Sequence, residues 1–157
     1  MAIEIERKFL VTGDAWKQQA SHSLRYEQGY LADTGSGTVR ARLEGDKARL
    51  NIKSAGIDIQ RLEFEYEIPV ADAREILENL CGTRRVSKTR YFVPMGEFVW
   101  EIDEFDGFNQ GLVVAEIELK SRDQEFPRPD WVGEEVSSDS RYLNNNLAKS
   151  PYTTWQV

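Results

Sequence analysis

Apolar and polar residues alternate along most of the chain, and residues 60–68 show the pattern most clearly. In this run Leu62, Phe64, Tyr66 and Ile68 occupy every second position, and the positions between them are charged. A period of two is typical of a β-strand whose two faces meet different surroundings. The same alternation predicts eight strands, over residues 2–11, 26–31, 38–44, 49–54, 60–68, 85–93, 98–105 and 113–120. Because short turns rich in glycine join several of these runs, we expect an antiparallel sheet.

Three further segments have the pattern of helices, at residues 14–20, 72–80 and 139–149. The second is expected to begin with Asp72 as its N-cap, because Glu75 follows at the spacing of a capping box. Gly82 is expected to end it. The length of 157 residues suits one domain over residues 1–157.

Like charges are grouped on the charged sides of the predicted strands. The groups are Glu4 with Glu6, Arg40 with Arg42, Glu63 with Glu65 and Glu67, Lys88 with Arg90, Glu101 with Asp103, and Glu116 with Glu118. Side chains two positions apart on a strand lie about 6–7 Å apart on the same face. Such pairs repel each other unless opposite charge lies nearby. A strand face that only meets water gains nothing from this grouping.

Three arrangements could place these charges: a solvated sheet face, an outer-membrane barrel, or a closed barrel with the charges inside. The membrane barrel is disfavoured because most predicted strands are shorter than the roughly 9–11 residues it requires, and helices lie between them. Repeated charge grouping disfavours the solvated face. We therefore predict an α+β fold built on an eight-stranded antiparallel β-barrel, with a charged interior and a few helices packed outside.

Composition narrows the choice of partners. The chain has 20 Lys and Arg against 27 Asp and Glu, so its formal net charge is −7. This balance argues against a binder of bulk nucleic acid. No apolar run approaches the roughly 20 residues of a membrane-spanning helix, and the charged first ten residues argue against a signal peptide. With Cys81 as the single cysteine, the expected location is a reducing compartment, the cytoplasm.

The two signs of charge predict two kinds of ligand. Clustered carboxylates without histidine or cysteine suit a hard cation such as Mg²⁺ or Mn²⁺. Clustered arginine and lysine suit phosphate oxygens. Metal-assisted phosphoryl transfer needs both groups in one site. Because several predicted strands carry basic pairs, the expected guest is a small triphosphate rather than a single phosphate.

These residues also carry a family resemblance. The run Glu4–Lys8 resembles the E-x-E-x-K motif of the CYTH superfamily, the triphosphate tunnel metalloenzymes. The later groups follow in the order that this family shows, with Lys53 between the two arginines and the glutamate run. Glu135, Asp139, Arg141 and Asn144 are similar to its C-terminal segment. The resemblance spans nearly the whole chain.

The resemblance implies a tunnel that binds a triphosphate and a divalent cation, and it assigns roles by position. The metal ligands would be Glu4, Glu6, Asp103, Glu116 and Glu118. The phosphate-binding residues would be Lys8, Arg40, Arg42, Lys53, Lys88, Arg90 and Lys120. The catalytic residues would be Lys8, Lys88, Glu63 and Glu65, of which either glutamate could accept a proton or only orient its basic neighbours.

The expected activity is metal-dependent hydrolysis of inorganic tripolyphosphate with release of orthophosphate, because a compact chain leaves little room for a base or thiamine pocket. The alternatives are an adenylyl cyclase, a thiamine triphosphatase, and a polyphosphate- or nucleotide-binding module without turnover. Two structural questions stay open. The C-terminal helix either plugs a tunnel mouth or covers the sheet, and the apolar outer face is covered by the chain's own helices or by a second copy in a homodimer.

Overall fold

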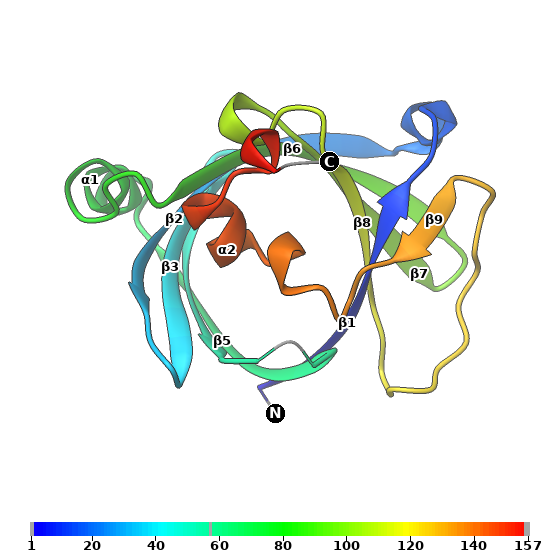
Figure 1. Ribbon diagram of the computed structural model, residues 1–157, viewed down its shortest axis with the longest axis horizontal. Helices are drawn as coiled ribbons and strands as arrows, with labels where there is room; N and C mark the ends of the chain where they lie inside the picture. Colours follow the sequence, from blue (N-terminus) through cyan, green and yellow to red (C-terminus); the bar gives the residue numbers. More distant parts are fainter. Residues whose placement is uncertain (1, 57, 156–157) are drawn as a thin grey trace.

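The chain folds into a closed antiparallel β-barrel (Figure 1). The computed structural model describes residues 2–56 and 58–155. Its barrel strands are β1 (Ile3–Val11), β2 (His22–Asp33), β3 (Gly37–Glu44), β4 (Lys47–Ser54), β5 (Gln60–Ile68), β6 (Arg85–Met95), β7 (Phe98–Phe105) and β8 (Val113–Glu118). Around the barrel the order is β1, β5, β4, β3, β2, β6, β7, β8 and back to β1. The predicted eight-stranded barrel is therefore confirmed.

Strand β1 closes the barrel because it has neighbours on both edges. One edge pairs with β8 from Glu6 to Leu10. The other edge is divided: Ile3–Ile5 pair with β5, whereas the end of the strand pairs with a ninth strand, β9 (Val132–Glu135). Strand β9 was not predicted, since four residues are too few to establish a period.

The helices differ from the prediction in detail. Helix α1 (Val70–Asn79) begins after Pro69, and no side chain caps it, so the prediction of Asp72 as N-cap was wrong. A proline fits just outside the first helical turn, where its missing N–H costs no hydrogen bond. The helix lies outside the barrel against β3 and β4 (Figure 1).

The other predicted helices are shorter than expected. The first is a 3₁₀ turn, η1 (Ala15–Gln19), and another such turn, η2 (Gly107–Asn109), follows β7. The C-terminal segment is not one helix but η3 (Ser140–Tyr142), α2 (Asn144–Lys149) and η4 (Tyr152–Thr154), with Leu143 extended between the first two. Within the described residues no helix combines the length and apolarity needed to cross a membrane.

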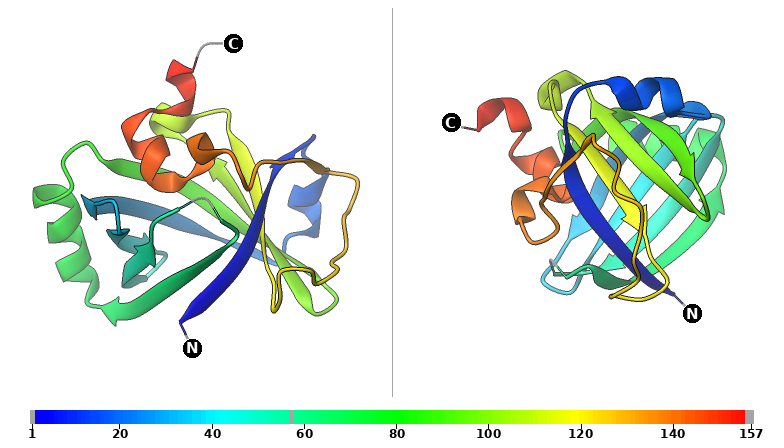
Figure 2. Two further views of the ribbon diagram at one scale, coloured as in Figure 1. Left: turned by 60° about the horizontal axis from the view of Figure 1, so that its bottom comes forward. Right: turned by 90° about the vertical axis from the view of Figure 1, so that its right-hand side faces the viewer.

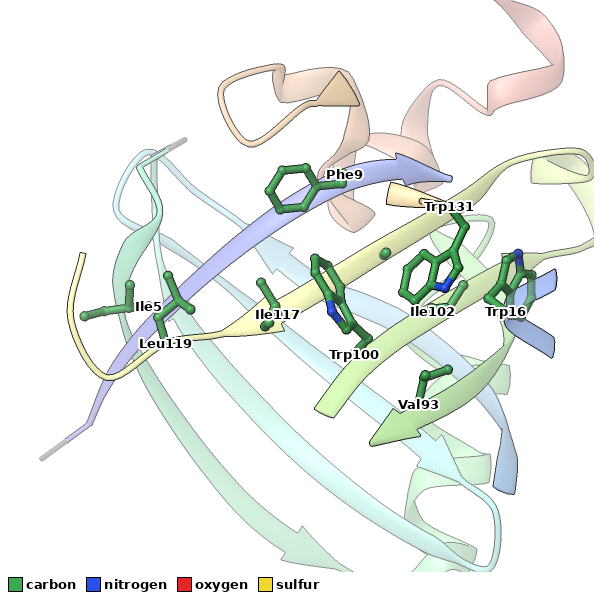
Figure 3. Close-up of a cluster of buried hydrophobic side chains, with 10 residues drawn as sticks. Ile5, Phe9, Trp16, Val93, Trp100, Ile102, Ile117, Leu119 and Trp131 are labelled. Atoms are coloured by element: carbon green, nitrogen blue, oxygen red, sulfur yellow. The ribbon is translucent and has the colours of Figure 1, made fainter. Parts of the chain in front are cut away.

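The main apolar core lies outside the barrel wall. It fills the outer faces of β1, β6, β7 and β8, and Figure 3 shows Phe9, Trp100 and Ile102 within it. Turn η1 contributes Trp16, and the segment before β9 contributes Trp131, so these two elements cover the wall. The Trp131 ring meets the Trp100 ring edge to face, with the two ring centroids 5.4 Å apart.

A second apolar core fills one end of the barrel interior. Val86, Phe105 and Val114 point inward from β6, β7 and β8, and Tyr142 and Leu147 of the C-terminal segment pack on them. Figure 2 shows this segment lying over one end of the barrel. The C-terminal segment therefore plugs the barrel at that end, and the charged interior occupies the remainder.

Candidate functional site

The barrel encloses a cavity of about 360 Å³ whose lining is almost entirely charged. Eight lining residues are basic and eight are acidic, so their formal charges balance. The basic residues are Lys8, Arg40, Arg42, Arg49, Lys53, Arg61, Lys88 and Arg90. The acidic residues are Glu4, Glu6, Glu44, Glu63, Glu65, Glu101, Glu116 and Glu118. A cavity lined in this way is costly to empty of water and ligands.

Strand alternation explains why these residues meet. On β3, Arg40 and Arg42 point inward while Ala41 between them is fully buried under α1. On β6, Lys88 and Arg90 point inward in the same way. The charge pairs of the sequence therefore lie on one inner wall of a closed sheet rather than on a solvated face.

Tyr26 of β2 lies among the basic side chains of the two neighbouring strands, β3 and β6. Strand β2 separates β3 from β6 and places the Tyr26 ring between their cations. The guanidinium carbons of Arg42 and Arg90 lie 5.1 and 4.9 Å from the ring centroid, and Lys88 Nζ lies 5.9 Å from it. Cation–π attraction at these distances holds three positive groups beside one another. Tyr26 thus supports the basic wall of the cavity.

Arg40 stands out among the basic residues. Its side chain is 7% exposed, yet among the described residues no carboxylate lies within ion-pair distance of it, and its Nε has no acceptor. By contrast, Lys53 pairs with both Glu4 and Glu63 at 3.3 Å. A buried guanidinium without a carboxylate partner is suited to binding an anion.

The acidic wall is formed by β1 and β8. Glu6 lies opposite Glu118 in the register, and Lys8 lies opposite Glu116. Burial, and then the neighbouring Glu116, raises the pKa of Glu6 well above its usual range. For Glu116 burial acts in the same direction, but Lys8 and Arg90 outweigh it and hold its pKa well below the usual range. The two neighbouring carboxyls therefore differ in proton affinity, and Glu6 holds a proton more readily than Glu116 does.

This donor set fits a divalent cation. Burial raises the pKa of Glu4 as it raises that of Glu6, and a neighbouring carboxyl adds to each shift, Glu63 for Glu4 and Glu116 for Glu6. A cation bound among these carboxylates would relieve their repulsion, and its ligands would all be oxygens, as Mg²⁺ and Mn²⁺ prefer. Within the described part of the chain, no three acidic, histidine or cysteine side chains already converge as a preformed metal cage.

Two residues expected in the site lie elsewhere. Asp103 is fully buried behind the basic wall: its Oδ1 accepts from Arg90 Nε at 2.7 Å, and its Oδ2 accepts from Lys88 Nζ and Arg90 Nη2 at 2.8 Å. With both oxygens engaged, it positions cations rather than facing the cavity. Lys120 is exposed beyond the end of β8, because the strand ends at Glu118. The backbone N–H of Lys120 donates to Gln124 Oε1 at 2.6 Å.

The remaining expected residues all line the cavity. They are Glu4, Glu6, Lys8, Arg40, Arg42, Lys53, Glu63, Glu65, Lys88, Arg90, Glu116 and Glu118. Lys88 is the most deeply buried of the cations at 1% exposure. Burial lowers its pKa to about 8, although Asp103 opposes that shift.

Sequence reasoning missed several lining residues, and strand parity could have found most of them. Tyr26 and Tyr30 share the inward parity of β2. Arg49 and Arg61 share the inward parity of β4 and β5. Leu143, Asn144 and Asn145 belong to the plugging segment, and no strand pattern places them. Lys8 Nζ donates to the carbonyl of Tyr142 at 3.1 Å and so ties that segment to the wall.

Comparison with known proteins agrees with this geometry. A family model described as CYTH domain matches residues 2–152. A protein named inorganic triphosphatase from Acetivibrio thermocellus is 49% identical over 156 residues, which is 99% of each chain. Another of that name from Nitrosomonas europaea is 40% identical over 94% of this chain and 97% of its own. The crystal structure of the inorganic triphosphatase NE1496 superposes with a TM-score of 0.66 at 36% identity, covering 94% of this chain and 95% of that one.

Proposed function

The chain belongs to the CYTH domain family, and on this premise we propose that its cavity hydrolyses inorganic tripolyphosphate with the help of a divalent cation. Water would add to a terminal phosphorus, and orthophosphate and pyrophosphate would leave. The names of the two relatives support this substrate, since each matches nearly the full length of the chain.

One observation carries the proposal: a charge-balanced cavity holds Arg40, which has no carboxylate partner among the described residues, on one wall and clustered carboxyls on the other. A polyanion alone would overload this lining with negative charge, and a cation alone would overload it with positive charge. The cation offsets part of the charge of the polyanion, so a metal-bound triphosphate suits the cavity better than the bare polyanion.

The basic residues are proposed to hold the phosphates. Lys8, Arg40, Arg42, Lys53, Lys88 and Arg90 would surround the chain of phosphates. Fixed cations in a cavity that excludes most water stabilise charge that develops on the leaving and equatorial oxygens. Lys8 lies on β1 within the acidic wall, with its Nζ 3.9 Å from Glu116, and so would contact a phosphate close to the metal.

Glu4, Glu6, Glu116 and Glu118 are proposed to hold Mg²⁺ or Mn²⁺. When bound, the cation supplies Lewis acidity that activates water and offsets phosphate charge. For proton acceptance we propose Glu63, whose ion pair with Lys53 is long at 3.3 Å. Glu65 is engaged more closely, because it accepts from Asn51 at 2.6 Å and from Arg49. Glu65 would therefore orient basic neighbours.

A substrate panel tests the activity. The purified protein is incubated with tripolyphosphate, ATP or thiamine triphosphate, each with Mg²⁺ or Mn²⁺, and the products are separated. We expect orthophosphate from tripolyphosphate at the highest rate. Cyclic AMP from ATP would identify a cyclase instead. Binding of tripolyphosphate without any product would identify a binding module.

Two variants test the metal ligands. Glu4→Gln and Glu118→Gln remove one charge each without changing shape, so activity should fall at limiting Mg²⁺ and recover in part at excess Mg²⁺. Glu78→Gln on the exposed face of α1 is the matched control and should behave as the unmodified protein. If both tunnel variants keep the unmodified rate and metal dependence, the ligand assignment is wrong.

A cytoplasmic location is also proposed. It rests on the composition and on Cys81, which is buried and free, as expected of a thiol that is not needed for cross-linking.

A further inference from the structure

The outer face of β5 carries apolar side chains that nothing in the described chain covers. Exposure is 49% for Leu62, 41% for Phe64 and 56% for Tyr66. Ile3 of β1 lies opposite Leu62, and Ile52 of β4 lies opposite Phe64, and these two are 42% and 38% exposed. The five residues form one continuous area across three strands, called here the β5 outer patch.

Other elements of the chain cover much of the remaining outer surface of the barrel. Turn η1 and β9 cover the outer faces of the strands from β6 to β1, and α1 covers β3 and part of β4. Among the described residues, the β5 side alone keeps a continuous bare apolar face. Single exposed apolar side chains are common on soluble proteins, but a continuous group of this size marks an interaction surface.

The area of the patch fits a dimer. The five side chains leave on the order of 500 Å² accessible, so two copies in contact would bury about 1,000 Å², which is the lower limit of specific interfaces. The net charge of the chain also favours contact through this patch. Two copies with a net charge of −7 each repel one another, and the patch contains no charged side chain, so contact there brings no carboxylates together.

We propose that the β5 outer patch is a homodimer interface in which the outer face of β5 packs against the same face of a second copy. A two-fold axis makes such a contact self-complementary, and two sheets can stack in this way about 10 Å apart. The cavity lining comes from one chain alone, so the dimer adds no residue to the site and leaves the cavity's chemistry unchanged.

The glutamates of β5 disfavour a dimer that forms through the edge of this strand. Strand β5 pairs with β1 only through residues 60–62, which leaves the edge of residues 64–68 without a strand partner. Antiparallel pairing of two such edges would place the inward row of Glu63, Glu65 and Glu67 opposite its own copy. Like charges opposite each other destabilise a sheet pair, so the face, and not the edge, is the favoured surface.

Analytical ultracentrifugation over a concentration series tests the interface. The unmodified protein should pass from monomer to dimer between about 1 µM and 1 mM, as expected for an interface at the lower size limit. The double variant Phe64→Lys, Tyr66→Lys should stay monomeric, with a dissociation constant raised at least tenfold. It should keep its tripolyphosphatase rate, because both side chains point away from the cavity.

Phe108→Lys is the matched control, since Phe108 is 79% exposed on η2, away from the patch. It should dimerise as the unmodified protein does. A protein that remains monomeric throughout the series overturns the proposal, as does a dimer that the double variant leaves intact. Because hydrolysis is measured separately on the same samples, failure of the dimer and failure of the proposed activity are distinguishable.

Discussion

At the scale of single residues, parity along a strand determined which side chains reach the cavity, but not what they do there. The alternation in the sequence places Asp103 on the same face as Glu101, so both could be expected to bind metal. Only the three-dimensional contacts show that Asp103 is saturated by Lys88 and Arg90. Tyr26 was missed for the opposite reason, because an aromatic ring on a strand is usually counted as apolar although its face attracts cations.

The pKa of Lys88 predicts the alkaline limit of activity. Burial lowers that pKa to about 8, so the ammonium group is charged below pH 8 and loses its proton above it. Because only the charged form attracts phosphate, kcat/KM should fall as the pH rises through about 8. A pH profile of tripolyphosphate hydrolysis measures this.

Lys88→Arg provides the control, because a guanidinium stays charged throughout the range. Its alkaline limb should move to higher pH whatever its absolute rate. An unmodified enzyme whose kcat/KM stays constant to pH 10 would show that Lys88 is not the titrating group.

At the scale of elements, long alternating strands were predictable and short or tertiary-dependent ones were not. Residues 60–68 and 98–105 match β5 and β7, because nine and eight alternating residues leave little ambiguity. Strand β9 and the broken C-terminal segment depend on partners far away in the sequence. The N-terminus of α1 was misplaced because Pro69, rather than a polar cap, determines where it starts.

Gly29 on β2 lies close to Leu77 of α1 and to Cys81, which follows that helix, and this contact can be tested. A Cβ atom there would lie 2.7 Å from Cys81 Sγ and 2.8 Å from Leu77 Cδ2, so Gly29→Ala must push the helix away. We expect a loss of about 1–3 kcal/mol in the free energy of unfolding, measured by urea titration. Gly35→Ala is the control, because nothing lies within 4 Å of its added Cβ. Equal stability of the two variants would contradict the close packing.

At the scale of the whole molecule, the barrel is a ring of opposed charges around one cavity. Formal charges balance in the lining although the chain as a whole carries −7. The overall acidity therefore lies outside the site and does not prevent the binding of an anion. Composition alone could not show this division, because it depends on closure of the sheet.

A ligand that bridges opposite walls should stabilise the whole barrel. EDTA prevents turnover, and tripolyphosphate at 100 times the dissociation constant measured for it in EDTA should add about 2.7 kcal/mol and raise Tm by roughly 5–10 °C. Differential scanning calorimetry measures the shift, with orthophosphate at equal phosphorus concentration as the control. An unchanged Tm in both samples would contradict a phosphate site inside the barrel.

The divided pairing of β1 also constrains how the protein is made. Glu4 and Glu6 precede in the sequence all the strands that β1 needs, which are β5, β8 and β9. A growing chain that has not reached Glu118 lacks part of the set of four carboxylates, so β1 must wait without its β8 partner until that point. Folding is then governed by contacts between strands far apart in the sequence, which form slowly. A product truncated before Glu116 would lack two of the four proposed metal ligands, and we therefore expect it to be inactive.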